Sequence, residues 1–286
     1  MRALLCLLLI ILATTANAQA QGETLSRIAE TGEFRIGFVP DAAPLSFRDA
    51  DGNVIGYSIE LCRRIASATR DHLGLDRINV TFVPLVTIED RINAIENGDI
   101  DIECGSTTVT LSRRERVDFT LMTFITGSAV LSRKASAIGG VDDLDGTEIA
   151  VLRGTTTEDV MRRVIDVNEF DIDLKLIDSH DEGMALLNDR KVDGYASDRA
   201  MLIGQVFRNA NASNQYAMTR SALSFEPYAL MVHRGDTEFR LVADKALASL
   251  FRGPGIRRLY QDWFGRYGEP LSPVVAAMYE FQAVGE

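Results

Sequence analysis

Strand and helix patterns alternate along this chain, and this alternation limits the possible folds more than any other feature. Short apolar runs such as 148–152 are followed by segments with apolar residues at helical spacing, such as 158–166. Strands separated by helices form mostly parallel sheets with helices on both faces, which is an α/β fold. The predicted strands are 34–39, 78–83, 100–104, 148–152, 174–177, 192–196 and 228–232, and the predicted helices are 24–31, 58–73, 88–97, 158–166, 181–188, 239–250 and 256–264.

The alternation occurs in two successive units. The 286 residues, of which 46% are hydrophobic and 25% charged, suffice for two domains of about 100 to 150 residues each. A polar connector at 133–145 opens the second unit. Sheets of this kind bind ligands at the carboxyl ends of their strands, so two lobes with a site at those ends are expected.

The N-terminus has the pattern of a secretory signal peptide. Arg2 precedes an apolar run at 3–13, and two A-x-A cleavage patterns follow at 16–18 and 18–20. The run is too short to span a bilayer. Cys6 lies inside the apolar run, so no lipid anchor is expected. We therefore expect residues 1–20 to be removed and the mature protein to be exported and soluble.

The mature chain is acidic and retains two cysteines. Without residues 1–20 it has 29 basic and 41 acidic residues, which argues against nucleic acid as a partner. An acidic surface does not attract an anionic ligand over distance, so any anion site must be built locally. Export permits a disulfide between Cys62 and Cys104, and two buried free thiols are the other interpretation.

Small and hydroxyl residues follow the predicted strand at 100–104. Residues 105–108 (GSTT) lie at its carboxyl end, where hydroxyls and backbone groups can face a ligand. A helical turn capped by Thr110 or Ser112 then carries Arg113, whose guanidinium can make two parallel hydrogen bonds to a carboxylate. A solvated basic helix face explains the same residues, and composition alone favours that interpretation.

A second loop has the same composition. The predicted strand at 148–152 runs into 153–159 (RGTTTED), which places three threonines at the start of the next helix. Free N–H groups at a helix N-terminus favour an anion. Capping by Thr156 or Thr157 accounts for one threonine but not for three.

Several of these motifs together resemble the bacterial extracellular solute-binding proteins of family 3, the periplasmic amino-acid receptors of ABC importers. The resemblance covers residues 23–268 and rests on LSF, DxxGNVIGYSIELCRRIA, DRINAIENGDIDIECGSTTVTLSRRERVDF, DLDGTEIAVLRGTTTEDV and a strand ending in Ser197 and Asp198. ECGSTT with a downstream arginine, and GTTTE, most resemble the glutamate and aspartate receptors. The resemblance implies a type II periplasmic binding protein, with two lobes and the ligand between them.

The resemblance also implies a role for each residue of the site. Arg113 and Thr108 would together bind the ligand α-carboxylate. Ser106 and Thr108 would accept hydrogen bonds from the α-ammonium group, and Asp198 would supply the opposing carboxylate. A buried zwitterion needs such partners, because each unpaired charge costs several kcal/mol. The other residues that the resemblance places at the ligand are Phe47, over its aliphatic part, Thr107 in the first loop, and Thr155, Thr156 and Thr157 in the second.

The ligand's side-chain end decides specificity. Arg91 and His180 occupy positions where the acidic-amino-acid receptors hold the distal carboxylate. The chain departs from the pattern at Val39, where those receptors have an arginine, and at Ile88, where they have a serine. These changes weaken the case for a dicarboxylate. Arg153 compensates for them from the second lobe, or else the ligand is glutamine, asparagine or a mixed polar set.

The resemblance implies a mechanism by lobe closure. The first lobe would comprise 23–127 with 226–286 and the second 128–225, with hinges near 127–130 and 224–228. Ligand binding to the open first lobe, followed by closure, gives the shape that a membrane permease recognises. We expect a monomer that has these two partners, an amino acid and a permease, and that uses no cofactor or metal.

An enzyme is the alternative from a different functional class. Common catalytic motifs are absent from the sequence, and His72, His180 and His233 lack metal-ligand spacing. The family includes prephenate and arogenate dehydratases that use a carboxylate between the lobes. Glu103 is the acid beside the first loop, and its place on a strand predicts that it points away. We therefore expect no catalysis.

Overall fold

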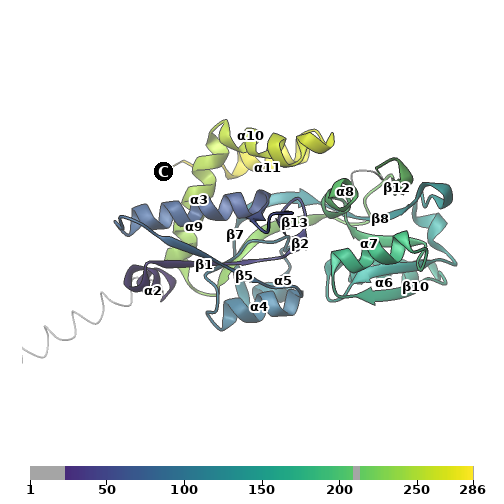
Figure 1. Cartoon of the computed structure of the whole chain (residues 1–286), viewed down its shortest axis with the longest axis horizontal. Coiled ribbons are helices and arrows are strands. Elements are labelled where there is room, and N and C mark those ends of the chain that lie inside the picture. The colour runs from purple at the N-terminus through teal and green to yellow at the C-terminus, as the bar shows by residue number, and fades with distance from the viewer. Residues whose placement is uncertain (1–22, 209–212, 286) are drawn as a thin grey trace, which may run out of the picture.

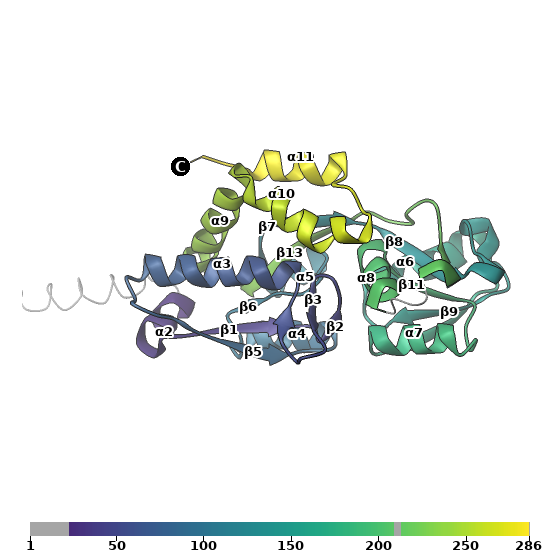
Figure 2. The same cartoon turned by 45° about the horizontal axis from the view of Figure 1, so that its top comes forward.

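The computed structural model describes residues 23–208 and 213–285. The predicted signal peptide lies outside these residues. Two five-stranded sheets, each flanked by helices, form two bodies that lie side by side (Figures 1 and 2). The chain passes from the first sheet to the second between Thr126 and Ser128 and returns between Met218 and Glu226. We propose 23–127 with 226–286 as lobe 1 and 128–225 as lobe 2.

The sheet of lobe 1 has the strand order β5-β1-β6-β13-β7. Its strands are β1 (Glu33–Phe38), β5 (Asn79–Pro84), β6 (Ile102–Glu103), β7 (Val117–Thr126) and β13 (Glu226–His233). Its helices are α2 (Glu23–Thr31), α3 (Tyr57–His72), α4 (Ile88–Glu96), α5 (Leu111–Arg114), α9 (Thr237–Arg252), α10 (Gly255–Trp263) and α11 (Pro273–Gln282). The short strands β2 (Asp41–Ala42), β3 (Ser46–Arg48) and β4 (Val54–Ile55) form a small sheet beside lobe 2.

The sheet of lobe 2 has the order β10-β9-β11-β8-β12. Its strands are β8 (Ser128–Arg133), β9 (Glu148–Leu152), β10 (Asp173–Ile177), β11 (Gly194–Asp198) and β12 (Tyr216–Met218), and its helices are α6 (Thr156–Asn168), α7 (His180–Asn188) and α8 (Arg199–Arg208). One apolar core lies under α7 and α8, and another under α6. Both faces of the sheet are therefore covered, as the α/β pattern predicts.

The prediction of mostly parallel sheets was wrong in part. In lobe 1, β1 pairs in parallel with β5 and β6, but β13 is antiparallel to β6 and β7. In lobe 2, β9 pairs in parallel with β10 and β11, but β8 is antiparallel to β11 and β12. β8 and β13, the first strands after the two crossings, run against the other strands of their sheets, whereas β7 runs in the same direction as β1, β5 and β6. A strand that returns from the other lobe runs against its neighbours, so both sheets are mixed.

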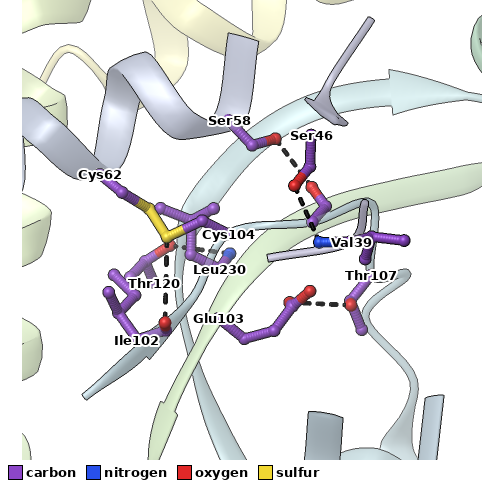
Figure 3. Close-up of a disulfide and its surroundings, with 11 residues drawn as sticks. Val39, Ser46, Ser58, Cys62, Ile102, Glu103, Cys104, Thr107, Thr120 and Leu230 are labelled. Atoms are coloured by element: carbon purple, nitrogen blue, oxygen red, sulfur yellow. Dashed lines mark hydrogen bonds between the residues drawn. A yellow bond between two sulfur atoms is a disulfide. The ribbon is translucent and has the colours of Figure 1, made fainter. Parts of the chain in front are cut away.

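A disulfide joins Cys62 on α3 to Cys104 at the end of β6, with a Cα to Cα distance of 6.4 Å (Figure 3). Both cysteines are fully buried. Ser58, one turn earlier on α3, donates a hydrogen bond from its hydroxyl to the Gly105 carbonyl at 2.7 Å. The disulfide and this hydrogen bond hold the start of the loop after β6 against α3.

None of the helices within 23–208 and 213–285 combines the length and the apolar character that a membrane span requires.

Candidate functional site

A cavity lies between the two lobes, at the carboxyl ends of β6, β9 and β11. Its lining residues are Ile88, Arg91, Ser106, Thr107, Thr108, Arg113, Leu152, Thr155, Thr156, Thr157, His180, Ala196, Ser197, Asp198 and Met201. All of the predicted binding residues except Phe47 and Arg153 are among them. The site is therefore formed by side chains from several loops, because the carboxyl ends of the strands of both sheets lie at this cavity.

The loop after β6 directs its polar groups into the cavity because its backbone is held from several sides. Thr108 forms a bridge with Tyr228 of β13, and Val109 donates to the Pro227 carbonyl at 2.8 Å. A Cβ atom at Gly105 would lie 2.2 Å from the Glu103 carboxylate, so a side chain at this position would displace that carboxylate. The glycine in ECGSTT is therefore needed so that Glu103 can reach the loop.

Arg113 is placed over this loop by the short helix α5. The Thr110 hydroxyl caps the helix by accepting from the Arg113 N–H at 3.1 Å, and the guanidinium donates to the Thr108 carbonyl at 2.7 Å. Burial and the positive charge of Arg91 lower the pKa of Arg113 to about 10. The group still carries its charge at neutral pH, so the loop presents a fixed cation to an anionic ligand group.

The threonines of the second loop have different partners. Thr155, and not Thr156 or Thr157 as predicted, caps α6 by accepting from the Glu158 N–H at 3.2 Å. The Thr156 hydroxyl donates to Glu226 at 2.7 Å and lies 3.4 Å from the Thr108 hydroxyl of lobe 1. Thr155 starts the helix, and Thr156 brings lobe 2 into contact with lobe 1.

Asp198 ends β11 and is partly buried. Tyr228 donates a hydrogen bond to one carboxylate oxygen, and Ser128 donates to the other at 3.4 Å. Burial raises the pKa of Asp198 to about 7, and the nearby negative charge of Glu226 adds to the effect. Two acids that disfavour each other's charge form a site that a cation would stabilise.

Arg91 projects from α4 into the other side of the cavity and is almost fully buried. One guanidinium nitrogen donates to the Thr107 hydroxyl at 3.2 Å and lies 3.5 Å from the Glu103 carboxylate. Thr107 in turn donates to Glu103 at 2.9 Å (Figure 3). The prediction that Glu103 points away from the loop was wrong, because the missing side chain at Gly105 leaves room for the carboxylate.

Glu103 is fully buried, and burial raises its pKa while Arg91, Thr107 and Arg113 oppose the rise. Its Oε1 atom has no hydrogen-bond partner within the described residues. A buried carboxylate in this position partly cancels the charge that Arg91 presents to the cavity.

His180 is the first residue of α7 and is also buried. Its Nδ1 atom shares a hydrogen bond with the Tyr195 hydroxyl at 2.5 Å. Burial lowers the pKa of His180, so the ring is neutral at neutral pH. A neutral imidazole with Nδ1 already occupied offers its Nε2 side as a hydrogen-bonding group, not as a charge.

Two predicted residues do not reach the cavity. The ring of Phe47 packs edge-on against Trp263 of α10, with ring centroids 6.0 Å apart. Arg153 forms an ion pair with Asp178 at 3.2 Å and is more than half exposed. Phe47 belongs to the packing beneath α10, and Arg153 points to solvent and leaves the position of Val39 uncompensated.

Sequence patterns gave no role to Glu226 and Tyr228, although both contact predicted site residues. One signal was present: Glu226 is an acid at the head of the apolar run 228–232, where a charge is expected to need a buried partner. Ser197 belonged to a motif that carried the resemblance but was given no role, and Met201 carried no signal, because it lies in an ordinary apolar stretch.

The arrangement suits a zwitterion. A cation from lobe 1 and a carboxylate from lobe 2 face one cavity, with a neutral histidine and a second arginine nearby. Among the residues that the structure describes, no group of three or more His, Cys, Asp or Glu side chains has the geometry to hold a metal ion.

Comparison with known proteins identifies the family. The family model described as "Bacterial extracellular solute-binding proteins, family 3" matches residues 34–266. The L-glutamate/L-aspartate-binding protein of Pseudomonas aeruginosa is 31% identical over 87% of this chain and 82% of its own length. The glutamate/aspartate import solute-binding protein of Salmonella typhimurium is 27% identical over 87% of this chain and 82% of its own.

Among solved structures, an ancestral arginine-binding protein bound to glutamine is 28% identical with a TM-score of 0.72, over 82% of this chain and 98% of its own. The resemblance seen in the sequence motifs is confirmed. The chain belongs to family 3 of the bacterial extracellular solute-binding proteins.

Proposed function

We propose that this protein binds an L-amino acid between its lobes, with glutamate and aspartate favoured, and delivers it to the permease of an ABC importer. One observation carries the proposal: Arg113 and Thr108 of lobe 1 line the same cavity as Asp198 of lobe 2. A partly buried guanidinium and a partly buried carboxylate are the partners that an α-carboxylate and an α-ammonium group require.

The preference for an acidic side chain rests on Arg91 and on the relatives that are named for glutamate and aspartate. Arg91 and His180 line the cavity together with the zwitterion-binding groups. The chain lacks the second cation that an arginine at Val39 would provide, and Glu103 lies beside Arg91. The acidic preference is therefore expected to be weaker than in a site with two unpaired arginines.

Delivery requires the lobes to separate and close. Arg91 and His180 are each about 5% exposed or less, so the part of the site around them is shielded from bulk water while the lobes are in contact. Hinge opening at 127–130 and 224–228 admits the ligand, and closure buries it. We propose that the protein does this as a monomer in the periplasm, after loss of residues 1–20, without a cofactor and without catalysing a reaction.

A thermal-shift screen tests the proposal. The mature protein, refolded to remove carried-over ligand, is measured against the twenty amino acids and prephenate at neutral pH. A ligand at a thousand times its dissociation constant stabilises the folded state by about 4 kcal/mol. We expect the largest rise in melting temperature with glutamate or aspartate. A rise with amides alone contradicts the acidic preference, and turnover of prephenate contradicts the receptor function.

The pair formed by Arg91 and Glu103 predicts a change in selectivity. Replacing Glu103 with glutamine removes a negative charge 3.5 Å from Arg91, so the affinity for glutamate relative to glutamine should rise about tenfold at pH 8. The affinity ratio isolates the side-chain end, because both ligands share the α-groups. Calorimetric titration with both ligands measures it.

The same ratio is expected to depend on pH. Glu103 has a raised pKa, so it gains a proton and loses its charge as the pH falls through that value. The wild-type ratio should then approach that of Glu103→Gln. Arg91→Ala should lower the ratio, and Glu89→Gln, on the exposed side of α4, should leave it unchanged. A ratio that falls in Glu103→Gln would show that Glu103 orients Arg91 and does not compete with the ligand.

A further inference from the structure

Asp41 of lobe 1 contacts the start of α7 in lobe 2. Its carboxylate accepts hydrogen bonds from the backbone N–H groups of His180 at 2.7 Å and of Asp181 at 3.2 Å. Both donors belong to the other lobe. Asp41 lies on β2, on the side of lobe 1 that faces α7 and α8 (Figures 1 and 2), and does not line the ligand cavity.

This contact satisfies a requirement of α7. The first N–H groups of a helix have no partner within the helix, and the positive end of the helix dipole favours an anion there. Ser179 caps the helix through the Glu182 N–H at 3.2 Å, and the N–H groups of His180 and Asp181 are left to Asp41. A helix of lobe 2 is thus completed by a carboxylate of lobe 1.

The same residue also contacts α8. Its backbone carbonyl accepts from the Gln205 amide at 2.5 Å, and Arg208 lies at 3.5 Å from the same oxygen. Gly204 allows this approach, since a Cβ atom there would lie 2.1 Å from the Ala43 carbonyl. Asp41 and Gln205 are both buried in the resulting contact.

We infer that Asp41 is a positioning residue that stabilises the closed arrangement of the lobes. The inference rests on the proposed function, because it concerns how tightly that site holds a ligand. The contacts of Asp41 form when the lobes meet and are lost when they separate. Apparent affinity is the intrinsic affinity scaled by the population of the binding-competent state. Asp41 therefore sets the affinity for every ligand by a common factor.

Asp41→Ala tests the inference with calorimetric titration of glutamate, aspartate, glutamine and asparagine. We expect all affinities that the wild type shows to fall by about tenfold, with their ratios unchanged, because the lost hydrogen bonds do not involve the ligand. The melting temperature without ligand should stay near the wild-type value, since, within the described part of the chain, the hydrogen bonds of this carboxylate cross between the lobes. Gln205→Ala, which removes one hydrogen bond to Asp41, should show a smaller common loss. Asp51→Ala, in an exposed turn of the same lobe, is the matched control and should change nothing.

Other outcomes overturn the inference. Loss for one ligand alone would make Asp41 part of ligand recognition, and unchanged affinities would show that the contact does not stabilise closure. A lower melting temperature without ligand would show that Asp41 stabilises the fold of lobe 1 and not the closed arrangement of the lobes. If the wild type binds no amino acid, the proposed function fails. Amide hydrogen exchange then tests whether Asp41 stabilises the contact between the lobes. Faster exchange at His180 and Asp181 in Asp41→Ala would then support the contact between the lobes, and equal exchange would reject it.

Discussion

Replacing Arg113 with alanine is expected to weaken binding of every amino acid by about a hundredfold or more. Removing one partner of a buried charge pair costs about 3 to 5 kcal/mol, because the other charge stays buried without a partner. At about 1.4 kcal/mol per tenfold, this corresponds to a factor of roughly a hundred to several thousand. The α-carboxylate is common to all amino acids, so the loss should not depend on the side chain. Calorimetric titration with glutamate and glutamine measures it.

Two matched variants make the Arg113 result interpretable. Arg114, the next residue of α5, is exposed and stacks its guanidinium over the Phe119 ring, so Arg114→Ala should bind as the wild type does. Arg113→Lys keeps the charge but cannot make two parallel hydrogen bonds, so it should recover only part of the affinity. An Arg113→Ala variant that folds and still binds glutamine well would show that the α-carboxylate lies elsewhere.

Many of the helices and strands could be predicted from local patterns, but β7, β8, α8 and α11 were not predicted. The predicted helix at 88–97 is α4, Ile88–Glu96, and its start carries a reciprocal capping pair between Thr87 and Asp90. Such signals are local, so the sequence carries them in full. The direction of β7 and β13 is not local. It depends on the path of the chain through the other lobe, and the strand pattern is the same for either direction.

The site could be predicted to a similar extent. Loops at the carboxyl ends of strands meet at one edge of a sheet, so the strand pattern alone places Thr155 and Asp198 near one another. Ser106 belongs to the other sheet and meets them only because the two lobes face each other. Side-chain direction is harder to predict. Arg153 turns to Asp178 and Phe47 packs on Trp263, because each finds its partner on an element distant in the sequence.

Contacts across the lobes were also missed. Asp41 resembles an ordinary loop acid in the sequence, since its partners lie about 140 residues further along the chain. The alternation of side chains along the strand predicted that Glu103 points away from the loop. The absence of a side chain at Gly105 lets its carboxylate reach Arg91. Charges that meet through tertiary packing leave no periodic pattern, so one sequence does not reveal them.

Replacing Asp198 with asparagine is expected to weaken the binding of all amino acids by about thirtyfold or more, since truncating one partner of a buried charge pair costs about 2 kcal/mol or more. Asparagine keeps the shape and still accepts a hydrogen bond from Tyr228. The variant therefore removes the charge that would pair with the α-ammonium group and little else. Asp178→Asn, which changes an exposed acid at the same edge of lobe 2, should leave affinity unchanged.

The pKa of Asp198 also predicts how ligand affinity depends on pH in the wild type and in Asp198→Asn. A proton on the carboxylate competes with the ammonium group, and the pKa of Asp198 is about 7. Binding requires the ionised form, so affinity should fall as the pH drops below 7, by up to about tenfold per pH unit. Asp198→Asn should lose this dependence. A wild-type affinity for glutamine that stays constant from pH 8 to pH 5 would show that Asp198 is ionised, and therefore solvated, before the lobes close over the ligand.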